Sequence, residues 1–475
     1  MTIPPPLPEE LVASLPEAIQ LYLRQIEAFA AQLANQVVAL KAQVAQLEAK
    51  LNQNSSNSSR PPSSDGPQHK RGVPRQPGQR RRGGQTGHAK QERVILPPDH
   101  TLDHKPSQCG RCGTPLTGDD PDPIIDQVIE LPVKLRLVTH HRRHSLDCPN
   151  CRARTTVAPV PEAINGFGPR IQAATSYFSG VGRLSKRSIA RLFADLYGIP
   201  MALGTVSKLE ARTSHALQSI HAEALTHTQT LDANVDETSW KQGSKKAWLW
   251  AAVTQLVTVF LIRKHRDRSA FDDLVGPTPG VLTTDRYSVY THLPSGKRQI
   301  CWAHLRRDFQ AMMDRRDPGS GIGDELLLHA DILTQEWLKV RAGTRTRLWF
   351  QRQILPWLRD EVHRLLVEGS LSQSEKSAVV CKDLLSLEVS LWTFATRPGV
   401  EPTNNAAERA VRHAVCWRKT SYGTDSEGGS RFVERILTVV ASCRSQDRDV
   451  MEFLMQANTA HRNQFPKPSL LDERA

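Results

Sequence analysis

Three acidic residues of this chain lie where a metal site could form. Asp236 belongs to the apolar run LDANVDETSW, Asp285 closes the run GVLTTD, and Glu408 lies within NNAAERAVRHAV. If Asn405 caps a helix there, Glu408 is its third residue and shares a side with Val411. A carboxylate that faces a core needs a partner, so Glu408 either closes a capping box or binds a metal ion.

The elements around the two aspartates predict how they could meet. The runs LDANVDETSW, KAWLWAAVT and LVTVFLIRK have hairpin spacing, and a helical segment, RSAFDDLV, precedes the strand that ends at Asp285. Three antiparallel strands, a helix and another strand form the order of a ribonuclease H-like core. If the first and fourth strands pair, Asp236 and Asp285 meet, and a cation must lie between them to prevent repulsion or protonation.

The cation that fits such a site is Mg²⁺, or Mn²⁺, since hard ions take oxygen ligands. Two such ions could activate a water or a 3′-hydroxyl and stabilise the leaving oxygen of an in-line phosphoryl transfer. Glu408 is the candidate for the third ligand. Asp232, on the same strand face as Asp236, is an alternative ligand, whereas Glu237 should point away from Asp236 and lie on the surface.

Two Cys-x-x-Cys pairs provide a second possible metal site. They are Cys109 with Cys112 and Cys148 with Cys151. Four thiolates are the ligands of a tetrahedral structural Zn²⁺, and the alternating segment QVIELPVKLRLV between the pairs predicts a strand of a zinc ribbon. A redox pair is the alternative. The remaining cysteines lack ligand spacing and are expected to be core thiols, namely Cys301, Cys381, Cys416 and Cys443.

Length and charge restrict the class of protein. The chain has 475 residues and a formal net charge of +13, which favours several folded units and a polyanionic partner, with nucleic acid more suitable than a membrane. The most apolar run, residues 247–262, is too short to span a bilayer, and the N-terminus lacks the blocks of a signal peptide. We therefore expect a cytoplasmic protein whose cysteines are not paired in disulfides.

The N-terminal third contains a heptad pattern followed by a basic linker. Apolar residues recur at alternating steps of four and three from Ile19 to Leu51, which predicts a coiled coil and self-association; a helix docked on the chain's own body is the alternative. Residues 60–93 then carry nine Lys or Arg against two acids. Such a segment can contact phosphates without reading sequence, and its densest run is Arg80, Arg81 and Arg82.

Residues 184–212 predict two helices separated by a turn at Gly198 and Pro200, with the second opening near Thr205. This pattern is typical of a helix-turn-helix, and plain structural packing is the alternative. The side chains available to DNA would be Lys186, Arg187, Thr205, Ser207, Lys208 and Arg212. Further cations that could contact a DNA backbone lie near His304 and Glu408, namely Arg306, Arg307, Arg409, Arg412, Arg418 and Lys419.

Several motifs in this order resemble the insertion-sequence transposases of the DDE type known as the sixty-six family. The resemblance covers nearly the whole chain, including the N-terminal heptads, the linker and the double Cys-x-x-Cys segment, and its central motifs are NVDETSW, TTDRYSVY, CWAHLRRDF and NNAAERAVR followed by RKTSYGTDSEGGSRFVERILTVV. It implies a DNA transposase that acts on the terminal inverted repeats of its own element, with Asp236, Asp285 and Glu408 as the metal-binding catalytic triad. It also implies a mainly helical insertion between Asp285 and Glu408, and small accessory proteins as partners.

Other functions remain open. A zinc-containing, dimeric DNA-binding regulator would need only the coiled coil, the ribbon and the helix-turn-helix. A nuclease or resolvase of the same fold would cleave without joining strands, and a decayed copy would be inactive.

The predicted fold is multidomain α+β. The parts are a coiled-coil helix (1–53), a basic disordered linker (54–94), a zinc ribbon (95–165), a helix-turn-helix region (166–226), the first part of a ribonuclease H-like core (227–310), a helical insertion (311–400) and the remainder of the core with the Glu408 helix (401–475).

Overall fold

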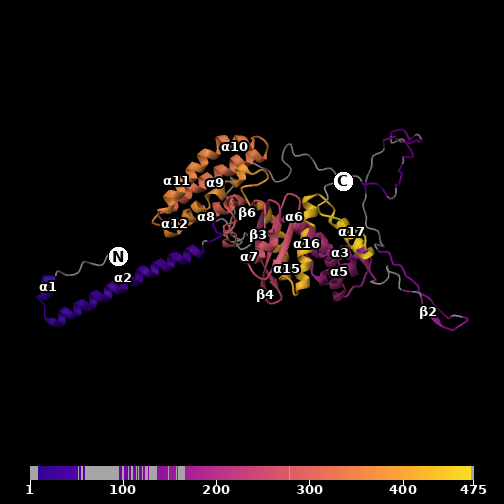
Figure 1. Cartoon of the computed structure of the whole chain (residues 1–475), viewed down its shortest axis with the longest axis horizontal. Helices are drawn as coiled ribbons and strands as arrows, with labels where there is room; N and C mark the ends of the chain where they lie inside the picture. The colour runs from indigo at the N-terminus through magenta and orange to yellow at the C-terminus, as the bar shows by residue number, and fades with distance from the viewer. Residues whose placement is uncertain are drawn as a thin grey trace.

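The computed structural model describes residues 9–51, short pieces between residues 53 and 158, and residues 166–277 and 279–471. A long helix, α2 (Glu17–Leu51), follows the short α1 (Glu9–Ala13) and projects from a globular part that begins at α3 (Pro169–Gly180) (Figure 1). Helices outnumber strands in the described residues, and most strands belong to one mixed sheet. The prediction of a mixed α and β chain is confirmed.

The central sheet has the strand order β5-β4-β3-β6-β7. Its first three strands are antiparallel, whereas β6 runs parallel to β3 and β7 runs parallel to β6. The first and fourth strands are therefore neighbours, which meets the condition for Asp236 and Asp285 to approach each other. The bounds are β3 (Ala233–Gln242), β4 (Lys245–Val253), β5 (Thr258–Arg263), β6 (Leu282–Thr284) and β7 (Arg298–Ile300), with α7 (Arg268–Val275) between β5 and β6.

The outer edge of β5 is closed by side chains from a helix, α16 (Glu427–Ser445). Ser442, Thr438 and Glu434, spaced four residues apart, accept hydrogen bonds from the backbone N–H groups of Thr258, Phe260 and Ile262. A strand edge normally presents unpaired backbone groups, which are costly when buried. The polar stripe of α16 satisfies these groups, so β5 can be buried without a further strand.

Four helices precede the sheet: α3, α4 (Lys186–Tyr197), α5 (Leu203–Ala216) and α6 (Gln218–Thr228). Ser185 caps α4 by accepting from the Ser188 N–H, and Gly198 ends it in the left-handed region at φ 60°, a conformation that suits glycine. The predicted pair of helices and its turn are therefore present, with the second helix beginning at Leu203. Buried Val206 and Leu209 lie on the inner side of α5.

A helical unit is inserted between β7 and the last part of the chain, as predicted. It has its own core, in which the Trp337 ring makes edge contacts with Phe350 and Phe394 at centroid distances of 5.4 Å and 4.8 Å. Its helices are α8 (Trp302–Asp314), α9 (Ser320–Arg341), α10 (Arg347–Gln353), α11 (Leu355–Ser370), α12 (Glu375–Ser386), α13 (Glu388–Leu391) and α14 (Thr393–Thr396). The chain then returns to the sheet through α15 (Asn405–Ser421), α16 and α17 (Val450–Asn463).

The segment with the paired cysteines is described only in part. A short antiparallel pair, β1 (Ser145–Asp147) and β2 (Arg154–Thr156), surrounds Cys151. Cys109 and Cys148 lie outside the described residues, as do most of the strand predicted over residues 127–138 and nearly all of the basic linker with Arg80, Arg81 and Arg82. The zinc ribbon therefore stays a prediction. No helix in the described part of the chain is both long and apolar enough to cross a membrane.

The β5 edge generates a prediction about pH. His221 on α6 shares a hydrogen bond of 2.9 Å between its Nε2 and the Phe260 carbonyl, and burial lowers the pKa of His221 to about 4. The unfolded chain protonates this histidine near pH 6.5 and the folded chain does not, so stability is lost as pH falls from 6.5 towards 4. Between about pH 7.5 and about pH 5, the free energy of unfolding in urea should fall in both proteins. The fall should be about 2 kcal/mol smaller in the His221→Gln variant than in the wild type.

The exposed His215 on α5 provides the control. The His215→Gln variant should keep the pH dependence of the wild type. Equal losses in wild type and His221→Gln would show that His221 does not stay neutral in the folded chain.

Candidate active site

The two predicted aspartates lie on neighbouring parallel strands. Asn234 of β3 is opposite Thr283 of β6, and the same register continued by two residues brings Asp236 level with Asp285, which directly follows β6. Each carboxylate is oriented by a nearby backbone group. Asp236 Oδ1 accepts from the Glu237 N–H at 3.0 Å, and Asp285 Oδ1 accepts from the Tyr287 N–H at 2.9 Å.

The third acid, Glu408, is held near them by the start of α15. The N-cap is Asn404, so Glu408 is the fourth helical residue and not the third. Asn404 is fully buried; its side-chain Nδ2 donates to the Val235 carbonyl on β3 at 2.7 Å, and its backbone N–H donates to Cys301 Sγ at 3.1 Å. Two hydrogen bonds thus attach the first turn of α15 to the strand that carries Asp236 and to the start of α8.

The capping-box interpretation of Glu408 was wrong. The Asn404 side chain makes no capping bond, and Glu408 instead faces cations from α8: its Oε1 lies 3.5 Å from His304 Nδ1 and its Oε2 lies 3.6 Å from Arg307 Nη2. Its side chain is 29% exposed, so it lies at the rim of the core and not within it. His304 and Arg307, which the sequence offered only as possible contacts for DNA, therefore lie beside Glu408.

The pKa values show the charge balance of the site. Burial, then the charge of Glu237 and those of Asp285 and Glu408, raise the pKa of Asp236 well above 3.8, while His304 opposes this shift. Burial lowers the pKa of His304, but Cys301 and Glu408 outweigh this effect and raise it to about 9. The acids lie close enough to disfavour one another's charge, which is the condition that a bound cation relieves.

The three carboxylates do not yet converge. Cys301, His304 and Glu408 lie together instead, with their ligand atoms all within 4.8 Å of one another. The described residues contain no other group of three metal-ligating side chains this close. We call these three residues the Cys-His-Glu cluster. The prediction that Cys301 is a core thiol missed this role, although the thiol is buried as expected. The Cys-x-x-His spacing of Cys301 and His304 was the signal in the sequence.

Glu237 is buried, which corrects the expectation that it lies on the surface. Its carboxylate is only 2% exposed, and it accepts hydrogen bonds from Arg266 and from the Tyr290 hydroxyl. It does point away from Asp236 along the strand, but that second face of the sheet is covered. Arg266 in turn stacks over the Tyr287 ring at 3.5 Å, so the carboxylate is neutralised inside a fixed shell.

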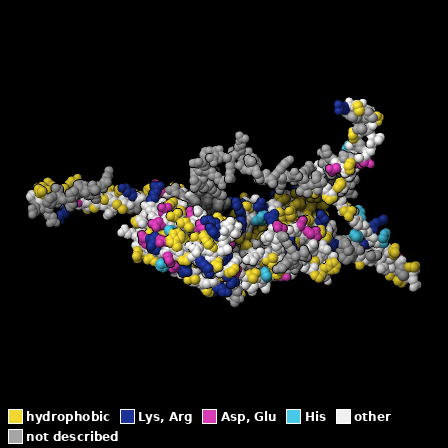
Figure 2. Space-filling view, turned by 90° about the horizontal axis from the view of Figure 1, so that it is seen from above, with side chains coloured by type: hydrophobic (Ala, Val, Ile, Leu, Met, Phe, Trp, Pro, Cys, Tyr) yellow, Lys and Arg dark blue, Asp and Glu magenta, His cyan; other side chains and the backbone are white. Residues whose placement is uncertain are grey.

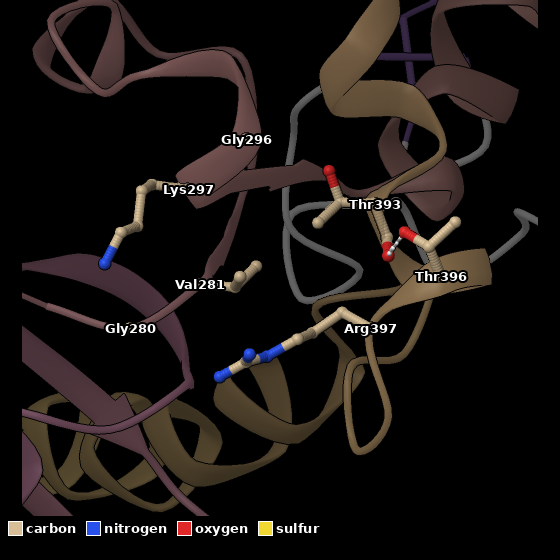
Figure 3. A pocket seen from close by; sticks show the side chains of 7 residues that line it. All are labelled: Gly280, Val281, Gly296, Lys297, Thr393, Thr396 and Arg397. Atoms are coloured by element: carbon tan, nitrogen blue, oxygen red, sulfur yellow. Dashed lines mark hydrogen bonds between the residues drawn. The ribbon is translucent and has the colours of Figure 1, made fainter.

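Asp232, the alternative ligand, is engaged elsewhere. It pairs with Arg397 at 2.9 Å and accepts from the Val281 N–H at 2.7 Å. Arg397, with Lys297, lines a hollow of about 250 Å³ at the start of β6, where the insertion meets the sheet (Figure 3). Lys297 donates to the Pro279 carbonyl, so both cations of this hollow have partners within the chain. Asp236 is therefore the better candidate.

The predicted DNA-binding side chains that the structure describes differ in how accessible they are. Lys208, Arg187, Arg409, Arg412 and Lys419 are exposed. Others are engaged by the chain itself: Lys186 bonds to Ser207 and Glu210, Arg306 pairs with Asp331, and Arg418 donates to Thr238 and Ser239 of β3. Thr205 and Arg212 are half-buried on α5.

Comparison with known proteins identifies the family. The sequence pattern of the transposase IS66 family matches residues 167–431, which is more than half of the chain and includes all three acids. The chain belongs to the IS66 family of transposases. A family of unknown function (DUF6444) matches residues 6–94, the region of α2 and the linker.

Two relatives of this IS66 member come from Sinorhizobium fredii. The uncharacterized protein y4qI is 26% identical over 241 residues, which are 45% of this chain and 43% of y4qI. The uncharacterized protein y4hP is 22% identical over 403 residues, which are 76% of this chain and 71% of y4hP. The chain thus spans less than half the length of the first of them.

The hydrogen bonds of Asn404 generate a prediction for the site. The Asn404→Ala variant leaves the buried Val235 carbonyl without its donor, so the free energy of unfolding should fall by about 1–3 kcal/mol. Asn405, the next residue, is exposed and provides a matched control. In urea unfolding the Asn405→Ala variant should resemble the wild type. Equal stability of the two variants would mean that the Asn404 amide does not hold α15 on the sheet.

Proposed function

We propose that this IS66 member is a DNA transposase of the DDE type that cleaves and joins strands at the terminal inverted repeats of its element. The observation that carries the proposal is the parallel pairing of β3 and β6, which brings Asp236 level with Asp285 while α15 supplies Glu408. Family membership supports the class of reaction.

The sheet supports a ribonuclease H-like core. An antiparallel meander of three strands, a helix, and two strands parallel to the first give the order β5-β4-β3-β6-β7. In this arrangement the first and fourth strands place acids at the same edge. The helical insertion interrupts the core between β7 and α15, so Glu408 reaches the site only through the long return of the chain.

The donor set fits Mg²⁺ or Mn²⁺. Asp236, Asp285 and Glu408 offer carboxylate oxygens, the ligands that these ions prefer. Burial and the neighbouring charges, that of Glu237 first, raise the pKa of Asp236, and a bound cation would oppose this shift. The bound ions would activate the attacking water or 3′-hydroxyl and stabilise the leaving oxygen. His304 and Arg307 on α8 make ionic contacts with Glu408, and these contacts oppose its movement towards the aspartates.

DNA contact would come from exposed cations close to these elements. Arg409, Arg412 and Lys419 lie on α15 with Glu408, and Lys208 lies on the exposed side of α5. Figure 2 shows Lys and Arg mixed with Asp and Glu over the visible face of the globular part, without one continuous basic patch. We therefore infer that phosphate contacts are distributed, with the basic linker contributing sequence-independent affinity.

The two Cys-x-x-Cys pairs are proposed to hold a structural Zn²⁺. The antiparallel pairing of β1 and β2 around Cys151 supports this proposal. Cys112 and Cys151 are both exposed, as thiols that serve a metal and not a core would be. The structural role follows from the full set of four thiolates, which leaves no open position for chemistry.

The helix α2 is proposed to pair with a second copy of the chain. Its heptad residues are largely exposed: Ile26 by 46%, Leu33 by 45% and Leu40 by 58%. Val37 and Val44 alternate with Leu40 and Leu47, and valine at one core position with leucine at the other favours two parallel strands. No described contact places these side chains on the chain's own body.

The function is tested with labelled DNA that carries the element's own ends, incubated with Mg²⁺ and the intact protein. The Glu408→Gln variant should lose at least about a hundredfold in cleavage, since even residues around metal ligands commonly cost that much. Glu427→Gln removes the same charge from an exposed site on α16 and should cleave like the wild type.

Each outcome assigns a function. Cleavage and joining by the wild type and Glu427→Gln alone support the transposase. Cleavage without joining indicates a nuclease, and DNA binding without cleavage indicates a regulator or a missing accessory protein. Full activity of Glu408→Gln would remove Glu408 from the triad.

Self-association is tested by light scattering on full-length variants. Ile26→Lys with Leu33→Lys places charges in the heptad seam and should lower the mass in solution. Gln25→Lys with Gln32→Lys adds the same charges one position earlier, on the outside, and should leave the mass unchanged. Identical masses for both variants would mean that α2 does not pair through its heptads.

A further inference from the structure

We propose that the Cys-His-Glu cluster is a second cation site, for Zn²⁺ or a similar borderline ion, which takes Glu408 away from the magnesium site. The proposal that the cluster binds a cation rests on the cluster alone. The proposal that this cation inhibits DNA cleavage rests on the proposed function. The site joins Cys301 at the N-cap of α8, His304 in the first turn of α8 and Glu408 in α15.

The geometry of the cluster fits a tetrahedral ion. His304 Nδ1 and Glu408 Oε1 lie 3.5 Å apart, and two ligands about 2.0–2.1 Å from a tetrahedral Zn²⁺ are separated by about 3.3 Å. Both atoms are buried, and neither has a hydrogen-bond partner among the described residues beyond their ionic contact with each other. Buried polar atoms without partners are costly, and a shared ion would satisfy both at once.

The donor types select the ion. Thiolate, imidazole and carboxylate are each ligands of Zn²⁺, and three protein ligands leave its fourth position open, whereas Mg²⁺ prefers oxygen ligands alone. Cys301 is the N-cap residue of α8, and its Sγ accepts the Asn404 N–H at 3.1 Å, which fixes the sulfur beside the other two ligands. The side chains of His304 and Glu408 are 20% and 29% exposed, so the cluster can be reached from solvent.

Occupation of the cluster would withhold one ligand from catalysis. In this structure Glu408 is already close to His304 and Cys301, while the three acids of the triad do not converge. A zinc ion would hold Glu408 in this position, so zinc and magnesium would compete for a single carboxylate. The expected result is inhibition by zinc that magnesium relieves.

Metal binding is measured on the full-length chain, with Zn²⁺ stoichiometry by competition against a chelator and with Co²⁺ as a spectroscopic probe. The paired cysteines near the N-terminus contribute equally to every variant. Cys301→Ser and His304→Gln should each bind one zinc ion fewer than the wild type, or bind it at least about tenfold more weakly. Cys301→Ser should also lose part of the thiolate-to-cobalt charge-transfer absorption.

Cys416→Ser provides the control, because this cysteine lies on α15 outside the cluster and should leave both readings unchanged. Equal stoichiometry in wild type, Cys301→Ser and His304→Gln would overturn the proposal. His304→Gln decides the matter if Cys301→Ser does not fold.

A second experiment adds zinc to the magnesium-dependent cleavage assay. The ratio of cleavage rates with and without zinc should be closer to one in Cys301→Ser than in the wild type. If no protein cleaves DNA, the inhibition arm gives no reading of the proposed function, while the cobalt spectra still decide the metal site.

Discussion

The buried amide of Asn404 is the constraint on which the candidate site depends. This single residue connects the first turn of α15 to the Val235 carbonyl on β3 and to Cys301 at the start of α8. Trp302 adds a backbone bond to Pro402, so the two helix starts are tied to each other as well. Because the helical insertion separates these segments in sequence, Glu408 could not approach Asp236 without such local ties.

The sheet that carries the aspartates is stabilised by an uncommon arrangement at its edge. The stripe of Glu434, Thr438 and Ser442 on α16 replaces the hydrogen bonds of a missing strand beside β5. Burial raises the pKa of Glu434 to about 7, against the neighbouring Arg431 and Arg263. The cost of this buried acid is offset by its bond to β5 and by those arginines, and the result is a sheet edge closed to other chains.

Charge is distributed unequally over the two faces of β3. On one face, the pKa of Asp236 is raised by burial and by the charges of Glu237, Asp285 and Glu408, and only His304 opposes the shift. On the other face, Glu237 is fully enclosed by Arg266 and Tyr290. Arg266 and Tyr290 fix Glu237 within the fold, yet burial and the charge of Asp285 still raise its pKa. The acids on both faces therefore add to the negative charge that a cation would balance.

The sequence by itself determined the order of helices and strands along the chain, the helical character of the segment after β7 and the long N-terminal helix, because apolar periodicity and turn residues act over short distances. The motifs also identified the family to which the chain belongs. Only the tertiary structure decided that Glu237 is buried, that Asp232 pairs with Arg397, that Asn404 is the cap and that Cys301 joins His304 beside Glu408. Those features depend on which segments meet across long separations, and the contacts of a side chain beyond its own helix or strand leave no periodic trace in the sequence.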